Sequence, residues 1–358
     1  MSEAQKAGAH ANSVGILGYG LYLPQHYMSA ADIAAATGGH WNEAAVRDKL
    51  GILRKTVPGP GDGTQAMGAR AAQDAITRSG IDPLEIDLVL CVGEEWKEYP
   101  LTTSATYIQA QIGAHRAWGI DIQQRCNTTV AAIKIAKDMM LSDPDIATTL
   151  IVGGYRNGEL IDYTDPDVSF MYDLATGAGA LLLRRGLGRN LVLGSHIITD
   201  GSFARDTGMY YGGTEHPIEA LPEAELSQLR ARGNRSLRVF DAEHMKTGLN
   251  QVSLRNWLEC IDKALAKSGA TRADIGYLNV LHFKRSMHAD MLETLGLAQE
   301  QTVYLENYGH LGQVDFMISL HEGLQQGRLK DGDLMVAIAA GIGYVWGAVA
   351  IRWGSSNR

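Results

Sequence analysis

The chain is poor in cysteine, contains no long apolar run and contains no run of basic residues. Its three cysteines, Cys91, Cys126 and Cys260, are spread over 358 residues. They are too few and too scattered for a disulfide framework or a zinc site, which fits a reducing cytoplasm. No apolar stretch is long enough to cross a bilayer. Because the net charge is −8 and no basic run is present, neither nucleic acid nor an anionic membrane is an expected partner.

The remaining composition is that of an ordinary soluble globular protein, with 45% hydrophobic and 20% charged residues. A chain of this length is expected to form two domains or one duplicated domain. Residues 1–12 are polar and have no apolar centre. They are therefore predicted to be a disordered tail and not a signal peptide.

Apolar strand-like segments alternate with helix-like segments along the chain. Residues 14–20, 87–92 and 148–153 have the composition of buried strands. Residues 64–79 have small apolar residues at helical spacing and are followed by Gly80, a typical helix stop. This alternation indicates an α/β fold.

Three further segments carry more specific predictions. Residues 178–183 and 191–198 are predicted to pair as a hairpin, and residues 302–305 to form a short strand. Residues 201–238 are rich in glycine and proline and follow no regular period. A segment of this length without a pattern predicts an irregular, lid-like excursion of the kind that is often functional.

The end of the second half of the sequence resembles the end of the first half. Residues 176–184 and residues 341–352 each contain glycines, then an apolar strand, then an arginine. Each half also contains a predicted helix that begins at a candidate catalytic residue. We therefore predict two similar α/β halves, residues 13–186 and residues 187–358.

The segment around Cys126 is the strongest local signal for catalysis. A strand predicted over residues 117–122 leads through a polar turn into a helix that begins at about Cys126, with an apolar face formed by Val130, Ile133, Ala136 and Met140. A thiol at a helix start faces unpaired N–H groups and the positive end of the helix dipole, which favour the nucleophilic thiolate. A buried, inert cysteine is the alternative that this segment alone leaves open.

Three other sites also follow predicted strands. His282 ends one strand, His310 opens a helix, and the glycine turn at residues 341–343 can bring a bare backbone N–H close to a ligand. In open α/β sheets, ligands gather beyond the carboxyl ends of the strands. A cysteine, a histidine and a backbone donor are the groups that acyl transfer through a thioester requires.

Several of these residues also have a simpler interpretation, in which they are ordinary surface or core residues. A single histidine is more often a surface or core residue than a catalytic one. The spacing of His282 and His288 is not that of a zinc site, so no metal is expected. The pair Glu94-Glu95 is typical of a solvated surface, although a carboxylate at a strand end can serve as a general base.

Taken together and in order, these segments resemble the thiolase superfamily, in particular its ketoacyl-ACP synthase III and HMG-CoA synthase branch. The resemblance runs from about residue 14 to residue 353. It is carried by residues 80–90, 121–126, 176–180, His282, Gly309-His310, 327–333 and 343–347.

The resemblance implies a duplicated five-layer α-β-α-β-α fold and a homodimer. It implies that Cys126 is the acylated nucleophile, that His282 is a catalytic histidine, and that the backbone N–H groups of Cys126 and Gly343 form the oxyanion hole. Tyr99 is expected to reach into the partner's active site and limit acyl length. The substrates implied are acyl-CoA or acyl carrier protein, with no further cofactor.

The sequence also differs from that branch. His310 stands where the branch has asparagine, and we predict that it stabilises an enolate and is not needed to acylate the nucleophile. Asn127 follows the nucleophile in place of a small residue, and Arg285 lies in an altered segment after the catalytic histidine. Both are candidate substrate-binding residues. Glu95 is a candidate base, because HMG-CoA synthases place their glutamate at this strand end.

These features predict a cytoplasmic acyltransferase that forms a β-ketoacyl product by Claisen condensation. One alternative delivers the acyl group from Cys126 to a non-thioester acceptor, and another condenses in the manner of an HMG-CoA synthase. A third alternative is a catalytically idle subunit that organises a partner enzyme. The presence of both Cys126 and His282 argues against the idle subunit.

Overall fold

The computed structural model describes residues 12–231 and 236–355. The tail predicted for residues 1–12 lies, except for its last residue, outside this part of the chain. The strands are β1 (Val14–Tyr22), β2 (His26–Ser29), β3 (Arg54–Val57), β4 (Leu88–Cys91), β5 (Trp118–Asp121), β6 (Thr148–Tyr155), β7 (Gly177–Arg185), β8 (Arg189–Thr199), β9 (Thr207–Met209), β10 (Leu237–Val239), β11 (Ile275–Val280), β12 (Leu334–Gly341) and β13 (Val345–Ser355).

The helices alternate with these strands. They are α2 (Ala30–Ala36), α3 (Glu43–Ala45), α4 (Thr64–Ser79), α5 (Ser104–Gln111), α6 (Thr128–Ser142), α7 (Glu223–Ala231), α8 (Ala242–Lys267), α9 (Arg285–Leu295) and α10 (Asp315–Gln325). The α4 helix has the predicted bounds, because glycines flank it: Gly63 is its N-cap and Gly80 adopts the left-handed conformation at its end.

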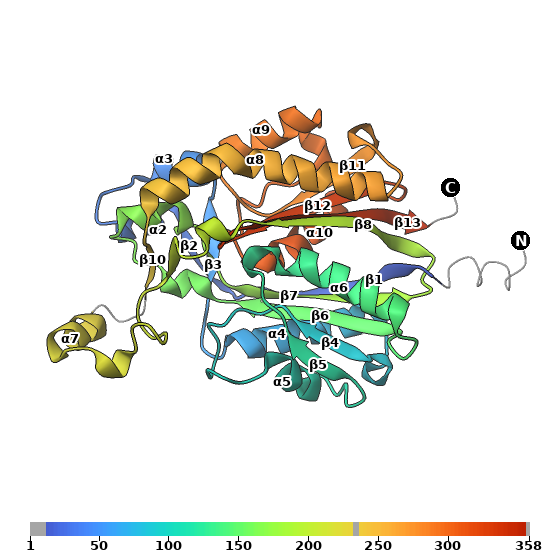
Figure 1. Ribbon diagram of the computed structural model, residues 1–358, viewed down its shortest axis with the longest axis horizontal. Coiled ribbons are helices and arrows are strands. Elements are labelled where there is room, and N and C mark those ends of the chain that lie inside the picture. The colour runs from blue at the N-terminus through green and yellow to red at the C-terminus, as the bar shows by residue number, and fades with distance from the viewer. Residues whose placement is uncertain (1–11, 232–235, 356–358) are drawn as a thin grey trace, which may run out of the picture.

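Five layers are visible in Figure 1. Helices α8 and α9 lie above one half of the sheet, α4 and α5 lie below the other half, and α6 and α10 lie between the two. The strand order is β11-β12-β13-β8-β1-β7-β6-β4-β5. Strands β1 and β8 pair only through Gly15 and Leu191, so the two halves of the sheet meet at a single point. This arrangement confirms the predicted five-layer α/β fold.

The two halves of the sheet follow the chain order. Strands β1, β4, β5, β6 and β7 precede residue 187, and strands β8, β11, β12 and β13 follow it. We retain residues 13–186 and 187–358 as our proposal for the two halves.

The predicted hairpin of residues 178–183 and 191–198 is wrong. Both strands exist, as β7 and β8, but β1 lies between them in the sheet. β7 pairs with β1 and β6, whereas β8 pairs chiefly with β13, from Val345↔Thr199 onward. Apolar runs identify strands without identifying their partners, and the short connection here crosses from one half of the sheet to the other.

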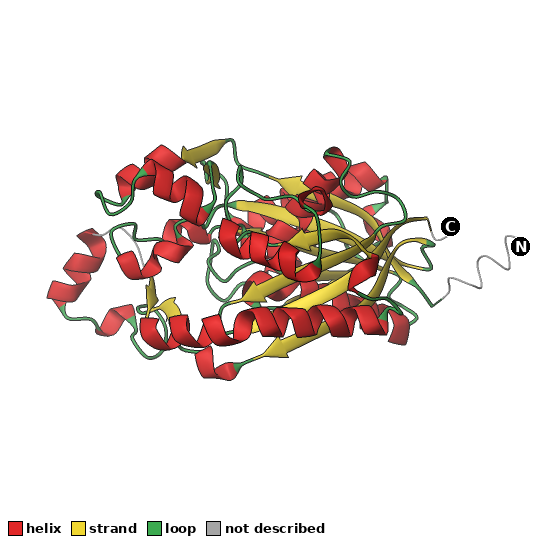
Figure 2. Cartoon of the chain, turned by 90° about the horizontal axis from the view of Figure 1, so that it is seen from above, coloured by secondary structure: helices red, strands yellow, loops and turns green. Residues whose placement is uncertain are grey.

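Two other predictions change in detail. Residues 302–305 are not a strand, because only a single bridge joins Thr302 to Leu278. The irregular excursion of residues 201–238 contains helix α7 and a small ribbon of β9 and β10. In Figures 1 and 2 this segment lies at the end of the molecule opposite the start of β1 and the end of β13.

Close backbone contacts fix the strand ends near the candidate site. A Cβ atom at Gly153 would lie 2.3 Å from the Gly93 nitrogen, and one at Gly154 would lie 2.1 Å from the Thr64 carbonyl oxygen. Only glycine permits β6 to approach the end of β4 and the start of α4 so closely. The segment that carries Glu94 is thereby held against β6.

Candidate active site

Cys126 lies in a tight turn between β5 and α6. A short 3₁₀ turn, Arg125–Asn127, precedes the helix, so the helix proper starts two residues later than predicted. Arg125 has φ 53, an uncommon backbone conformation for a residue with a side chain. The Thr128 hydroxyl stabilises the turn, accepting from the Gln124 N–H at 2.9 Å and donating to the Arg125 carbonyl at 2.5 Å.

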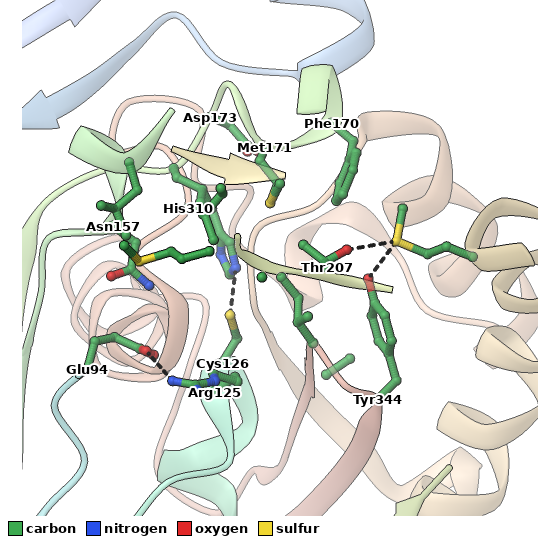
Figure 3. Close-up of a pocket in the computed structure, with 18 of the residues that line it drawn as sticks. Glu94, Arg125, Cys126, Asn157, Phe170, Met171, Asp173, Thr207, His310 and Tyr344 are labelled. Carbon is green, nitrogen blue, oxygen red and sulfur yellow. Dashed lines mark hydrogen bonds and ion pairs between the residues drawn. The ribbon is translucent and has the colours of Figure 1, made fainter. Parts of the chain in front are cut away.

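A continuous chain of contacts joins Cys126, His310 and Asp315. The Cys126 Sγ lies 3.2 Å from His310 Nε2, and His310 Nδ1 lies 2.6 Å from Asp315 Oδ2 (Figure 3 shows the first contact). Because the carboxylate can only accept when ionised, His310 Nδ1 carries a proton. Burial lowers the pKa of His310, but Asp315 and Cys126 oppose burial and leave this pKa well above its ordinary value. The geometry therefore favours a thiolate–imidazolium pair.

Asp315 connects the groups of the site. Its carboxylate is fully buried, accepts from the Leu311 N–H at 2.8 Å through Oδ1, and accepts from the His282 backbone N–H at 2.8 Å through Oδ2. It is the first residue of α10, where the helix dipole stabilises negative charge. The sequence analysis missed this residue. A carboxylate at the start of the helix that follows His310 was the available signal.

His282 follows β11, as predicted, and lines the cavity over Cys126, with its buried Nδ1 left unpaired among the described residues. Its Nε2 donates to the Leu50 carbonyl at 3.1 Å and lies 3.5 Å from the Asp173 carboxylate. No hydrogen bond joins it to Cys126 within residues 12–231 and 236–355. Burial lowers the pKa of His282, against the attraction of nearby carboxylates. The structure thus brings His310, rather than His282, against the thiol.

A cavity of about 1280 Å³ opens over Cys126. Figure 3 shows Glu94, Arg125 and Asn157 on one side of Cys126, and Phe170, Thr207 and Tyr344 on the other. The excursion contributes much of the second side. From this excursion the wall includes Thr207, Gly208, Met209, Tyr211, Gly212, Gly213 and Leu237. A group bound to Cys126 therefore faces a polar wall on one side of the cavity and a more apolar wall on the other.

Glu94 and Glu95 occupy different environments at the end of β4. The Glu94 side chain is 3% exposed and the Glu95 side chain 69% exposed, and Arg125 contacts each at 3.2 Å. Burial raises the pKa of Glu94, although Arg125 and Asn157 act in the opposite direction. A buried carboxylate with a raised pKa fits a general base better than an exposed one does. The sequence analysis selected Glu95 because it had no means of distinguishing the burial of adjacent residues.

Gly343 lies in the turn between β12 and β13. Its neighbours Ile342 and Tyr344 line the cavity, and a Cβ atom at Gly341 would lie 2.3 Å from the Gln124 carbonyl oxygen. The glycine turn therefore packs directly against the turn that carries the nucleophile, and the oxyanion hole predicted there stays a prediction.

The three predicted substrate-binding residues lie outside the cavity wall. Asn127 is buried behind the nucleophile and donates to the Gln124 side chain at 2.7 Å. Arg285 contacts Glu306 at 2.8 Å and lies 4.4 Å from the centre of the Tyr304 ring. Tyr99 is 70% exposed, whereas the adjacent Pro100 reaches the cavity. Their predicted roles in binding substrate remain untested.

Comparisons with known proteins agree with this fold. The family model 3-Oxoacyl-[acyl-carrier-protein (ACP)] synthase III matches residues 120–201, and the model of its C-terminal part matches residues 265–353. A beta-ketoacyl-[acyl-carrier-protein] synthase III of Symbiobacterium thermophilum is 28% identical over 345 residues, 95% of this chain and 98% of the relative.

Solved structures show the same fold. A 3-oxoacyl-[acyl-carrier-protein] synthase III from Aquifex aeolicus superimposes with a TM-score of 0.79 at 22% identity, covering 95% of this chain and 100% of the other. The priming beta-ketosynthase of the R1128 polyketide pathway gives a TM-score of 0.79 at 20% identity, covering 96% and 97%. The fold is thus that of the thiolase superfamily. Within it, the chain belongs to the ketoacyl-ACP synthase III branch.

The described part of the chain shows neither a metal centre nor a membrane span. No group of three or more His, Cys, Asp and Glu side chains there is arranged to hold a metal ion. No helix in the same part of the chain combines the length and the apolar character that crossing a bilayer needs.

The raised pKa of His310 leads to a testable prediction about Cys126. The imidazolium is present below its ordinary pKa and persists until the pH rises through its raised pKa. We expect His310→Ala to slow alkylation of Cys126 by iodoacetamide at pH 7 by about tenfold or more, which corresponds to about 1.4 kcal/mol of lost ion pairing. Intact-mass time courses measure the rate, with Cys126→Ala as the blank.

A matched control distinguishes loss of the Cys126–His310 pair from a general effect of replacing a histidine. His115 is exposed, so His115→Ala should alkylate like the wild type. If His310→Ala alkylates at the wild-type rate across pH 6 to 9, His310 does not activate the thiol.

Proposed function

We propose that the protein transfers an acyl group from the thioester of CoA or an acyl carrier protein to Cys126 and then condenses it with a second thioester, giving a β-ketoacyl product. The observation that carries this proposal is the Cys126–His310–Asp315 chain beneath the cavity. Membership of the ketoacyl-ACP synthase III branch supports it.

Acylation of the thiol uses both partners of the ion pair. The Cys126 thiolate attacks the thioester carbonyl, and the backbone N–H groups of Cys126 and Gly343 are proposed to hold the oxyanion. When the intermediate collapses, the new bond to Cys126 remains and the bond to the donor sulfur breaks. The His310 imidazolium gives its proton to the leaving thiolate, and Asp315 keeps the resulting neutral ring in place.

The condensation step then needs a carbon nucleophile. In the proposed reaction a malonyl-type thioester loses CO₂, and the resulting enolate attacks the acyl carbonyl and expels the Cys126 thiolate. No base is required, because loss of CO₂ supplies the electron pair. Acylation leaves Nε2 of His310 without a proton, so donation to the enolate oxygen, the role predicted from the sequence, requires that the ring takes up a proton from solvent before the second thioester reacts. The contact of His310 with the thiol argues against the other half of that prediction, that His310 is not needed to acylate Cys126.

One observation favours a second candidate function. After acylation the neutral His310 has its proton on Nδ1, held by Asp315, and a bare Nε2 that faces the acylated sulfur. A base in this position can deprotonate a hydroxyl or amine that attacks the acyl group. Transfer to a non-thioester acceptor is therefore the alternative that the geometry supports.

The buried Glu94 supports a third variant, condensation without loss of CO₂. A base is needed there to remove a proton from the α-carbon of the second thioester. Glu94 lines the cavity beside Arg125, and burial raises its pKa. The idle-subunit alternative has less support, because Cys126 contacts His310 and His310 in turn contacts Asp315.

A homodimer in the cytoplasm is part of the proposal, with acyl-CoA or acyl carrier protein as the partner molecules. β5 is the last strand of the sheet and leaves Trp118 49% and Ile120 43% exposed. The nearby Tyr99, Leu101 and Tyr107 are exposed as well. An uncovered apolar edge strand is a site of association, and we propose that a second copy covers it.

The main proposal predicts a covalent adduct. Incubation with acetyl-CoA and with longer acyl-CoAs should add the mass of one acyl group per chain, and Cys126→Ala should abolish it. Product analysis with malonyl-thioester present should then reveal a β-ketoacyl compound and CO₂. An adduct without such a product, consumed only by an added hydroxyl or amine acceptor, would establish the second candidate instead.

The glutamates give a second prediction. Glu94→Gln should lower turnover by a non-decarboxylating condensation on the order of 10²-fold, the usual contribution of a general base, and leave formation of the acyl adduct unchanged. Glu95→Gln, at the exposed neighbour, is the matched control and should leave both rates unchanged. Equal effects of the two substitutions would contradict a specific role for Glu94.

The dimer gives a third prediction. Light scattering at micromolar concentration should report twice the mass of one chain, and the double variant Trp118→Lys with Ile120→Lys should report a monomer, because charges on the edge strand oppose pairing. Tyr27→Lys, at a side chain that is 57% exposed elsewhere, should remain dimeric. A monomeric wild-type protein would refute the proposed interface.

A further inference from the structure

A lysine lies in the interior of the protein beneath the two histidines. Lys55, on β3, is 1% exposed, and its Nζ donates to the carbonyl oxygens of Tyr172 and Leu174, each at 2.7 Å. The same Nζ lies 4.9 Å from the centre of the Tyr163 ring. Two carbonyls and an aromatic face accommodate all three N–H bonds of an ammonium group. Lysine is rarely buried without a partner, so the position requires an explanation.

The two carbonyls that Lys55 binds flank Asp173, and Asp173 is connected to both histidines. Its backbone carbonyl accepts from the His310 N–H at 2.9 Å, and its carboxylate lies 3.5 Å from His282 Nε2. The His310 carbonyl in turn accepts from the Ala175 N–H at 2.9 Å. Lys55 therefore holds the short segment against which the backbone of His310 is paired.

Lys55 also acts on Asp173 through its charge. Burial raises the pKa of Asp173, and the positive charges of His282, His310 and Lys55 lower it. The other titratable groups coupled to Asp173 are the tyrosines Tyr155, Tyr163 and Tyr304. Burial lowers the pKa of Lys55 to about 7, with Asp173 opposing burial. Removal of Lys55 thus leaves Asp173 easier to protonate.

We propose that Lys55 is a positioning residue for the active site: it fixes the Tyr172–Ala175 backbone that orients His310, and its positive charge acts on the Asp173 carboxylate. Lys55 does not line the cavity and does not touch substrate. The inference rests on the proposed function only in taking the Cys126–His310 pair as the reactive site. It concerns this chain's own residues and makes no assumption about the acyl donor.

The experiment measures the rate of Cys126 alkylation by iodoacetamide from pH 5.5 to pH 9, a readout that needs no knowledge of the substrate. Cys91 and Cys260 are buried, and burial raises the pKa of each to about 12, so background labelling is expected to be low. Cys126→Ala provides the blank. Thermal unfolding of each variant determines the folded fraction and the stability.

Lys55→Met should slow alkylation at pH 6 by about tenfold, with a smaller effect at pH 8.5. Asp173 becomes protonated at a higher pH in this variant, and the imidazolium of His310 then loses a nearby negative charge. The acid limb of the profile therefore moves to higher pH. Lys55→Arg, which keeps the charge and the donors, should retain a profile close to that of the wild type. Lys49→Met, at an exposed lysine of the preceding segment, should not alter it.

A double-mutant cycle tests whether Lys55 acts through Asp173. Asp173→Asn should slow alkylation at every pH tested, because asparagine carries no charge at any pH, and adding Lys55→Met should slow it little further, because coupled residues are not additive. Additive losses of rate would overturn the proposal. A folded Lys55→Met protein with a wild-type profile would overturn it as well, as would a loss that matches only the unfolded fraction.

If Lys55→Met does not fold, Lys55→Gln takes its place. Glutamine can donate two N–H bonds to the carbonyls but carries no charge, so it should still move the acid limb to higher pH. A Gln variant with an unchanged acid limb would contradict the role of the Lys55 charge. A failure of the acyl-CoA experiments would refute the proposed function and leave this result standing, because iodoacetamide needs only the thiol.

Discussion

The active site depends on one buried carboxylate, that of Asp315. Three groups donate to it: the ring of His310, the backbone N–H of Leu311 and the backbone N–H of His282. A buried carboxylate is stable only when hydrogen bonds and positive charge surround it. Because His310 supplies that charge, the raised pKa of the imidazole and the burial of the carboxylate maintain each other. The nucleophilic character of the Cys126 thiol follows from the pairing of Asp315 with His310.

A second group of charged residues lies close to Asp315 and His310. Asp173 lies between the two histidines, and Lys55 holds the backbone on either side of it. The interior beneath the cavity thus contains alternating acidic and basic groups that come from β3, from the segment before β7, from the end of β11 and from the start of α10. Hydrogen-bonded partners make such networks rigid, and among these groups only the buried Nδ1 of His282 lacks a hydrogen-bond partner within the described residues. This rigidity is what a site that must align a thiol, an imidazole and a thioester requires.

The cavity above this network has two chemically different walls. Glu94, Arg125 and Asn157 form a polar wall beside the nucleophile, whereas the excursion and the β12–β13 turn supply a more apolar one. Decarboxylating condensation, condensation with a base and transfer to a hydroxyl or amine all need the same thiol. They differ in the base that they need, so Glu94 and His310 are the residues that decide between them.

The sequence by itself determined most strands and helices of the two halves, the nucleophilic turn and, through its resemblance to the thiolase superfamily, the five-layer fold. Periodicity and glycine positions reveal such features because they are local: Gly80 ends α4 wherever that helix packs. Sequence also located both histidines, His282 after β11 and His310 shortly before α10. It did not reveal which strands pair, so β7 and β8 were taken for a hairpin although β1 lies between them.

Only the tertiary structure decided which of the candidate residues meet. Burial distinguishes Glu94 from its neighbour Glu95, and the contact with the Cys126 thiol distinguishes His310 from His282. Asp173 and Lys55 had no motif to mark them, because their importance arises from residues that are distant in the chain. The physical reason is that the pKa of a group depends on desolvation and on charges a few ångströms away. Those distances exist only once β3, β11, α10 and the turn of Cys126 have packed together.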